Sequence, residues 1–580
     1  MIVMPEFSES ALPLAEYPRP QFRRESYLSL NGEWEYAIRK DPAIPASYDG
    51  NILVPYPPES PASGVGRVLN KDEWLIYRRT FTLPDGFFEG RLLLQLGAVD
   101  QIAEVLLNGV AVGRHEGGYL PFTVDLTDAY REGENELVVR VSDDADTHIY
   151  GRGKQRYRHG GIWYTPISGI WQSVWLESTP TAALTSLRMT SDAATHTLSL
   201  APMANTEGRV TVEVMDGERV LATATASAGS EVTLSLPMCK LWSVDTPELY
   251  GLRLTFGEDR VESYFGIRSY GKIGVNGKQY FAENGKPIFY NGLLDQGYWQ
   301  QGLYTPPTMR AVWQELSRVR ELGYNMLRKH CKVEPMLYYY YCDILGIAVW
   351  QDMPNGGRRE RGYRLVLAPF LNLHLNDNNY RAMGREDPAS REQYMREAED
   401  MQDALHNCVS LCLYTPFNEA WGQFDAVRVT ETLRAHDPSR LYDHASGWQD
   451  KGGGDVRSRH IYFRPARPKN DGRRILALTE FGGYSYAVAG HDFSARPFGY
   501  KRFKTAEGLA AAYEKLYMTE VIPAIMHEGL SATVYTQLTD IEDEINGIFT
   551  YDRVEKLPAD MLIRVNRAVR AAFAAHRDDS

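Results

Sequence analysis

Two glutamates, Glu419 and Glu480, each follow an apolar run typical of a buried β-strand, residues 409–414 before the first and 475–479 before the second. If both strands belong to one parallel barrel, the two carboxyl groups lie across its carboxyl-terminal end from each other. Glycoside cleavage requires such a pair, because one carboxyl group protonates the leaving oxygen while the other attacks the sugar or activates water. Acidic residues end strands in any barrel, so spacing alone leaves the pair a hypothesis.

The ends of the other predicted strands supply candidate sugar contacts, each with a structural alternative. The polar residues expected there are Asp295, Arg328, His330, Asp352, Asn418, His460 and Tyr462. Arg328 would lie beside the glutamates but could be an ion-pair partner within a barrel layer. The histidines could be structural, and the two aspartates could cap helices. Trp421 and Trp448 are candidate platforms for a sugar ring, with core packing as the alternative.

These residues need a scaffold that brings distant strands together, and the chain from residue 271 to 580 has the pattern of a (β/α)8 barrel. The expected strands are 288–293, 325–328, 347–351, 409–414, 441–443, 460–463, 475–479 and 532–536. The expected helices are 308–322, 335–345, 389–406, 425–436, 506–528 and 560–575. No helix is apparent after the fifth and sixth strands. A doubly wound sheet is the alternative, although no glycine-rich phosphate loop follows the first strand.

The preceding residues have a β pattern throughout. Residues 1–178 contain short alternating apolar runs separated by turn signals such as Asn108-Gly109, which predicts a jelly-roll-like β-sandwich. Residues 179–270 contain further short strands and no helical pattern, which predicts a smaller immunoglobulin-like sandwich. The expected fold is therefore two β-sandwich domains followed by a barrel domain.

Composition limits the classes of partner. The chain has 580 residues, of which 43% are apolar and 24% charged, as in soluble globular proteins. A net charge of −12 argues against nucleic acid and against an anionic membrane surface. Five cysteines without a Cys-x-x-Cys pair predict no zinc site, and no cofactor is expected. The first residues include Glu6, Glu9 and Glu16 and show no signal peptide, so we expect a cytoplasmic location.

Two motifs around the glutamates are recognisable. Phe417-Asn-Glu-Ala-Trp-Gly422 and Leu478-Thr-Glu-Phe-Gly-Gly483 resemble the two signatures of glycoside hydrolase family 2, which includes β-galactosidases, β-glucuronidases and β-mannosidases. Further resemblances follow in the family's order along nearly the whole chain, at residues 31–34, 77–81, 160–165, 168–175, 264–268, 322–330 and 535–553. A lone Asn-Glu dipeptide would mean little, whereas this ordered set is specific.

The resemblance implies a retaining mechanism with Glu480 as nucleophile and Glu419 as general acid/base. It also implies that Asn418 contacts the sugar 2-hydroxyl group. Arg328 and a hydrogen bond from Tyr462 would keep Glu480 ionised. Glu419 would hold its proton because of the negative charge on Glu480 nearby. The expected partner is a β-linked carbohydrate, and a homo-oligomer is left open.

Departures from the family's patterns bear on the sugar. Residues 350–354, Trp-Gln-Asp-Met-Pro, lack the histidine of the metal-binding pattern of large β-galactosidases, so we expect no magnesium ion. The β-glucuronidases use an Asn-x-Lys pair after the nucleophile, and nothing between Glu480 and Leu538 supplies one. The leading expectation is a β-galactosidase. The alternatives are a β-glucuronidase, a β-mannosidase, an arabinosidase, or a non-catalytic carbohydrate-binding protein on the same fold.

One long connection carries a basic run, Arg358, Arg359 and Arg361. It spans residues 356–389, after the third predicted strand. A solvated loop and a lid over the site are the two interpretations.

Overall fold

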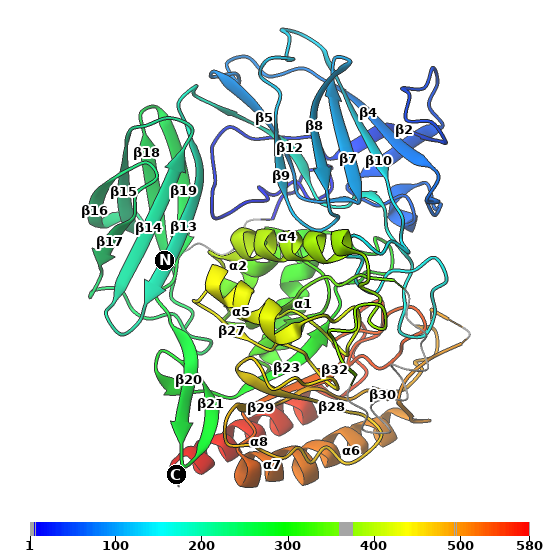
Figure 1. Cartoon of the computed structure of the whole chain (residues 1–580), viewed down its shortest axis with the longest axis vertical. Helices are drawn as coiled ribbons and strands as arrows, with labels where there is room; N and C mark the ends of the chain where they lie inside the picture. Colours follow the sequence, from blue (N-terminus) through cyan, green and yellow to red (C-terminus); the bar gives the residue numbers. More distant parts are fainter. Residues whose placement is uncertain (1–4, 6, 359–374, 492, 495, 579–580) are drawn as a thin grey trace.

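The computed structural model describes the chain except residues 1–4, 6, 359–374, 492, 495 and 579–580. It has three parts: a first β-sandwich at the top of the view, a second at the left, and a barrel below them (Figure 1). The predicted fold class is confirmed. None of the described helices combines the length and apolarity that crossing a bilayer requires.

Antiparallel sheets enclose the core of the first sandwich. In β10, Leu137, Val139 and Val141 alternate toward that core, as the period of a strand requires. Asn108 and Gly109 both have positive φ, 53° and 81°, and form the predicted hairpin turn. The six-stranded sheet contains, in order, β3 (Gly50–Val54), β2 (Gly32–Arg39), β4 (Trp74–Phe81), β10 (Asn135–Ser142), β7 (Ile102–Leu107) and β8 (Val110–Glu116). The four-stranded sheet contains β1 (Leu28–Ser29), β12 (Val174–Thr179), β5 (Arg91–Leu96) and β9 (Phe122–Asp125). A separate two-stranded sheet pairs β11 (Gly169–Ile170) with β6 (Val99–Asp100). A short 3₁₀ helix, η1 (Pro61–Ser63), follows β3.

The second sandwich is smaller and has its own core. Val210, Val212 and Val214 of β15 are buried in it. One sheet contains β13 (Leu184–Asp192), β14 (Thr197–Ala204) and β17 (Val232–Ser235), and the other contains β16 (Arg219–Ser227), β15 (Arg209–Asp216), β18 (Tyr250–Phe256) and β19 (Asp259–Phe265). Buried Arg24 joins the two sandwiches, because its guanidinium donates to Asp259 at 2.9 Å and to Glu177 at 3.4 Å.

Eight parallel strands form the barrel. All eight expected strands are present: β23 (Tyr290–Asp295), β24 (Met326–Lys329), β25 (Ala348–Asp352), β26 (Leu411–Thr415), β27 (Leu441–Tyr442), β28 (Val456–Ile461), β29 (Ile475–Gly482) and β32 (Ala532–Thr536). β32 pairs with β23, and β27 and β28 are joined through the Asp455 amide, which donates to the Tyr442 carbonyl oxygen at 2.8 Å. Outside the circle lie β20 (Tyr270–Val275), β21 (Lys278–Glu283) and β22 (Lys286–Pro287), and β30 (Tyr484–Ser485) paired with β31 (Lys501–Arg502).

Helices surround the barrel close to the expected positions. They are α1 (Met309–Glu321), α2 (Met336–Leu345), α4 (Pro388–Leu405), α5 (Ala426–His436), α6 (Ala506–Leu516), α7 (Ile522–Glu528) and α8 (Ala559–Asp578). The predicted single helix over 506–528 is interrupted by a π-helical turn, η2 (Tyr517–Val521). Pro523, which lacks an N–H donor, follows at the start of α7. In the described segments after β27 and β28 there is no helix, as expected.

The barrel strands sort their side chains into two layers. Met326 and Trp350 belong to the inner core, whereas Leu327 and Val349 belong to the layer beneath the helices. Because alternate residues of a strand face opposite sides, Arg328 points inward and Lys329 points toward the helices. This alternation decides which strand-end residues meet at the catalytic centre.

Candidate active site

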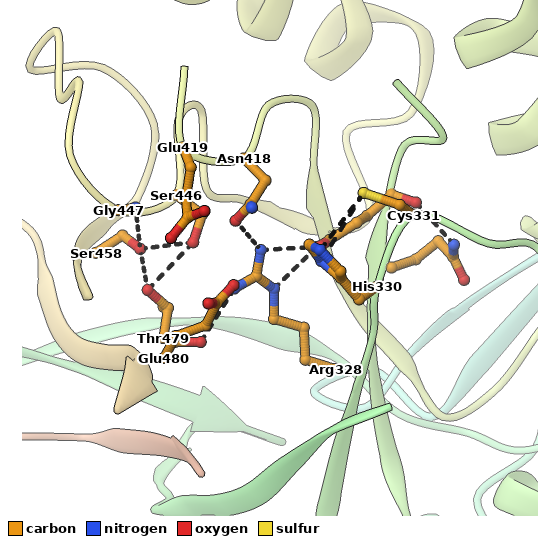
Figure 2. Close-up of polar contacts among 12 residues, drawn as sticks. Arg328, His330, Cys331, Asn418, Glu419, Ser446, Gly447, Ser458, Thr479 and Glu480 are labelled. Atoms are coloured by element: carbon orange, nitrogen blue, oxygen red, sulfur yellow. Dashed lines mark hydrogen bonds and ion pairs between the residues drawn. The ribbon is translucent and has the colours of Figure 1, made fainter. Parts of the chain in front are cut away.

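Arg328 joins four strand ends at the carboxyl end of the barrel. Its side chain is fully buried. Its Nε and Nη2 atoms donate to the two oxygens of Asp352 at 3.0 and 2.9 Å. Nη2 also donates to Asn418 Oδ1 at 2.8 Å, and Nη1 donates to Glu480 Oε1 at 3.1 Å (Figure 2). A rigid guanidinium fork therefore fixes the positions of three partners from β25, β29 and the segment after β26.

Glu480 lies in β29 and accepts hydrogen bonds on both carboxylate oxygens. Besides Arg328, the hydroxyl group of Tyr462 donates a short hydrogen bond to Oε2. Burial raises the pKa of this carboxyl group, but the neighbouring His460 and Arg328 outweigh burial and lower the pKa below its ordinary value. His330 and Lys154 act in the same direction. Glu480 is therefore held as a carboxylate at neutral pH.

Glu419 approaches from the turn that follows β26. Its φ is 51° and that of Ala420 is 65°, a conformation that non-glycine residues seldom adopt and that recurs at functional sites. Its amide donates to the Ser446 carbonyl oxygen at 2.8 Å, which anchors the turn. Its Oε1 lies 2.8 Å from His460 Nδ1. The turn thus places the carboxyl group over the barrel axis.

The two glutamates converge on one space. Figure 2 shows both carboxyl groups directed toward each other beside the Arg328 guanidinium. Ligand atoms of Glu419, His460 and Glu480 all lie within 4.8 Å of one another. Retaining glycosidases hold their carboxyl groups about 5–5.5 Å apart, whereas inverting enzymes need about 6.5–9.5 Å for a water molecule. One oxygen of each glutamate therefore lies closer to the other than the inverting spacing.

His460 connects this pair to a buried hydroxyl network. Its Nε2 lies 3.0 Å from Ser446 Oγ. Ser446 Oγ in turn contacts Ser458 at 3.0 Å and Thr479 at 3.1 Å (Figure 2). The Trp448 ring lies against the histidine ring, with centroids 6.1 Å apart. With both ring nitrogens engaged, the imidazole orientation is fixed, and so is the Glu419 oxygen beside it.

Asp352 and His330 lie one layer behind the glutamates. His330 Nδ1 contacts Asp352 Oδ2 at 2.6 Å, and the second interaction of Asp352 is with Arg328. Burial raises the pKa of Asp352, but Arg328 and His330 lower it more, so it stays ionised. Asp352 therefore supports Arg328, and its predicted contact with a sugar stays a prediction.

Asp295 is not brought to the pair. It is two residues after the outward-facing Leu293, so strand alternation points it toward α2. There it contacts Lys329 and accepts from Tyr338, both at 2.9 Å. Lys329 also pairs with Glu334 at 2.6 Å. The aspartate belongs to a buried ion network outside the barrel axis.

Two groups of described residues bring three potential metal ligands together: His330, Cys331 and Asp352, and Glu419, His460 and Glu480. Arg328 bonds to a carboxylate in each group. Its fixed positive charge repels a second cation, so these donor sets do not fit a divalent metal. Arg359 and Arg361 of the basic run, with residues 359–374 of the suggested lid, lie outside the described residues.

A segment of the first sandwich completes the site, and sequence reasoning about strand ends missed it. Trp163 packs on Trp421 with ring centroids 4.1 Å apart. The Tyr164 hydroxyl donates a short hydrogen bond to Glu544, and Gln296 donates to Tyr164 at 2.7 Å. The only signal in the sequence was the Gly160-to-Thr165 motif, interpreted as the end of the sandwich.

Comparisons with known proteins agree with this architecture. The family model described as "Glycosyl hydrolase 2 galactose-binding domain-like" matches residues 65–161, and "Glycosyl hydrolases family 2" matches residues 172–268. A putative β-glucuronidase of Formosa agariphila is 25% identical over 296 residues, which is 48% of this chain and 34% of the relative. A β-galactosidase of Thermoanaerobacter pseudethanolicus is 24% identical over 381 residues, 62% of this chain and 45% of the relative. The chain thus spans less than half the length of these two relatives.

Solved structures share the fold over nearly the whole chain. A β-galacturonidase of Eisenbergiella tayi has a TM-score of 0.71 at 19% identity and covers 94% of this chain and 98% of its own. A β-glucuronidase of Ruminococcus gnavus has a TM-score of 0.75 at 17% identity, covering 97% and 100%. Family 2 models thus match two adjoining segments ahead of the barrel, and these findings support glycoside hydrolase family 2 as the family of this chain.

Proposed function

We propose that this protein is a retaining, exo-acting β-glycosidase that removes terminal β-linked sugars by double displacement. The observation that carries the proposal is the approach of the Glu419 and Glu480 carboxyl groups to within 4.8 Å, with His460 beside both. This separation leaves no room for a water molecule between a base and the sugar, so one glutamate must act as the nucleophile.

Glu480 is the better nucleophile of the two. Arg328 and Tyr462 both donate to its oxygens, so its negative charge is stabilised without a proton. In the first step a Glu480 oxygen attacks the anomeric carbon and the bond to the leaving oxygen breaks. Glu419 transfers its proton to that oxygen, so the leaving group departs as a neutral alcohol.

The second step reverses the roles of Glu419. The proton transfer leaves Glu419 as a carboxylate, and formation of the glycosyl ester removes the negative charge on Glu480 beside it. Glu419 then takes a proton from water while the water oxygen attacks the anomeric carbon. The ester bond breaks and Glu480 recovers its charge, so the configuration of the sugar is retained.

Asn418 suits a contact with the sugar 2-hydroxyl group. Its Oδ1 is fixed by Arg328, and its amide hydrogens have no partner among the described residues. A donor held in this way can bond the hydroxyl oxygen, and such a contact strengthens in the oxocarbenium-like transition state. Trp421 and Trp448 line the same region as candidate ring platforms.

The identity of the sugar remains a prediction. The relatives include β-galactosidases and β-glucuronidases, and the similar solved structures include a β-galacturonidase. A galactoside was expected from the sequence, chiefly because no Asn-x-Lys pair follows Glu480. A panel of aryl galactosides, glucuronides, mannosides and arabinosides separates these alternatives.

Product stereochemistry tests the mechanism directly. Proton NMR of a reaction with an aryl β-glycoside should show the β-anomer of the free sugar first, followed by slow mutarotation. Initial release of the α-anomer would refute the double displacement. Failure of the wild type to cleave every substrate of the panel would refute the glycosidase function itself.

A further inference from the structure

A segment of the first sandwich reaches the catalytic end of the barrel. The backbone amides of Arg152 and Gly153 both donate to the Asn355 carbonyl oxygen, at 3.0 Å, in the connection that follows β25. A side chain at Gly153 would collide with the Cys331 carbonyl oxygen, 2.6 Å from the ideal Cβ position. This close backbone contact fixes residue 154 against the barrel.

Lys154 presents a positive charge there. Its Nζ lies 5.3 Å from the centre of the Trp421 ring, and Trp421 is only two residues after Glu419. The side chain is half-buried. Lys154 is close enough to act electrostatically on Glu480, where it lowers the pKa, and on Glu544. The cation therefore lies beside the candidate active site.

The positive charge of Lys154 is not paired with a carboxylate among the described residues. Among the described residues its ammonium group makes no hydrogen bond and no ion pair. The neighbouring carboxylates already have partners: Glu480 has Arg328 and Tyr462, and Glu544 accepts from Tyr164 and, at 2.9 Å, from Asn546. An ammonium group with only an indole face beside it has hydrogen bonds left for an anion.

No Asn-x-Lys pair follows Glu480, but a cation can come from another part of the chain. Lys154 belongs to the first sandwich and lies 326 positions before Glu480. Its location next to Trp421 gives the protein a means of binding a negatively charged group without the missing Asn-x-Lys pair.

We propose that Lys154 is a specificity-determining residue that binds an anionic group of the substrate sugar, either the carboxylate of a uronic acid or a sulfate ester. The proposal rests on the glycosidase function proposed above and names its substrate class. Acidic β-glycosides would then be preferred over neutral ones, because a neutral sugar offers the ammonium group no counter-charge.

The test compares Lys154→Met with the wild type. Methionine keeps much of the side-chain length but removes the charge. Arg158→Met is the matched control, because it removes a charge from an exposed position of the same segment. For each protein, kcat/KM is measured on aryl β-galactoside, β-galacturonide, β-glucuronide and a sulfated β-galactoside.

We expect Lys154→Met to reduce kcat/KM on at least one acidic substrate about 10- to 100-fold more than on the neutral galactoside, as for loss of a charge-assisted hydrogen bond. A selective loss on uronides identifies a carboxylate, and a selective loss on the sulfated substrate identifies a sulfate ester. Arg158→Met should show no such selectivity. Equal losses on acidic and neutral substrates, or a wild type that prefers the neutral galactoside, would overturn the assignment of Lys154.

A binding measurement separates this proposal from the function on which it rests. Calorimetric titration of Glu480→Gln with galacturonate, glucuronate and galactose does not depend on turnover. If the wild type cleaves nothing yet Glu480→Gln binds a uronate tightly and loses that binding when Lys154→Met is added, only the glycosidase function fails. If the wild type hydrolyses its substrate normally but Lys154→Met weakens the binding of uronate and of galactose to the same extent, only the role of Lys154 fails.

Discussion

Replacing Tyr462 by phenylalanine isolates one hydrogen bond to Glu480, the proposed nucleophile. The tyrosine hydroxyl donates to Glu480 Oε2 and lies 3.1 Å from Thr536 Oγ1. The ring is stacked on Tyr500 with centroids 3.8 Å apart and planes 7° from parallel. Phenylalanine preserves the stack, so the substitution removes the donor and leaves the packing.

The sign and size of the effect follow from this contact. The hydrogen bond stabilises the ionised form of Glu480, so its loss raises the pKa of that carboxyl group. A hydrogen bond to a charged group contributes about 1.5–3 kcal/mol, and one pKa unit corresponds to about 1.4 kcal/mol. We therefore expect the acidic limb of the kcat/KM profile to move upward by about one to two pH units, with activity lost at a higher pH on acidification.

The assay is kcat/KM against pH on whichever aryl β-glycoside the wild type cleaves. Tyr338→Phe is the matched control, because it removes a tyrosine hydroxyl from another buried carboxylate, Asp295, outside the site. That variant should keep the wild-type profile. An unmoved acidic limb in folded Tyr462→Phe would contradict the assignment of Glu480 as the group whose ionisation governs activity.

Three further substitutions test the site. Glu480→Gln should lose turnover by several powers of ten while still binding sugar, and near-normal hydrolysis would refute its role as nucleophile. Glu419→Ala should turn over slowly and recover in part with azide, which attacks without base assistance; no recovery would count against its acid/base role. Asp295→Ala should lower the free energy of unfolding by about 3–5 kcal/mol in urea titration, because Lys329 loses a buried partner. A raised KM with unchanged stability would instead support a sugar contact at Asp295.

The barrel was predictable because its strands and helices carry local signals. Thr308 caps α1 by accepting from the Ala311 amide, and Gly346 ends α2 with φ of 68°, both of which are visible as residue types. The π-turn at 517–521 was not predictable, since apolar periodicity continues through it. β27 contains two residues, one fewer than the expected strand 441–443. The backbone bond that joins its Tyr442 toward β28 is donated by the Asp455 amide.

The site residues that could be predicted are those at the ends of the barrel strands. The glutamates, Arg328, Asn418, His460 and Tyr462 meet as expected. Asp295 instead contacts Lys329 and Tyr338, away from the glutamates, because a shift of one residue along a strand reverses the direction of the side chain. Lys154 and Trp163 were missed because long-range packing between domains leaves no periodic trace in the sequence.

The backbone amides of Arg152 and Gly153 in the first sandwich donate to Asn355 of the barrel, so two domains meet at the candidate active site. Arg328 donates to Asp352, Glu480 and Asn418 together, so a substitution of any one of them disturbs the others. Lys154, beside Trp421, belongs to the first sandwich, and its ammonium group makes no hydrogen bond or ion pair among the described residues. If Lys154 selects the sugar as proposed, substitutions in the first sandwich can change the accepted sugar without altering the groups bonded to Arg328, and one scaffold can thereby diversify across glycans.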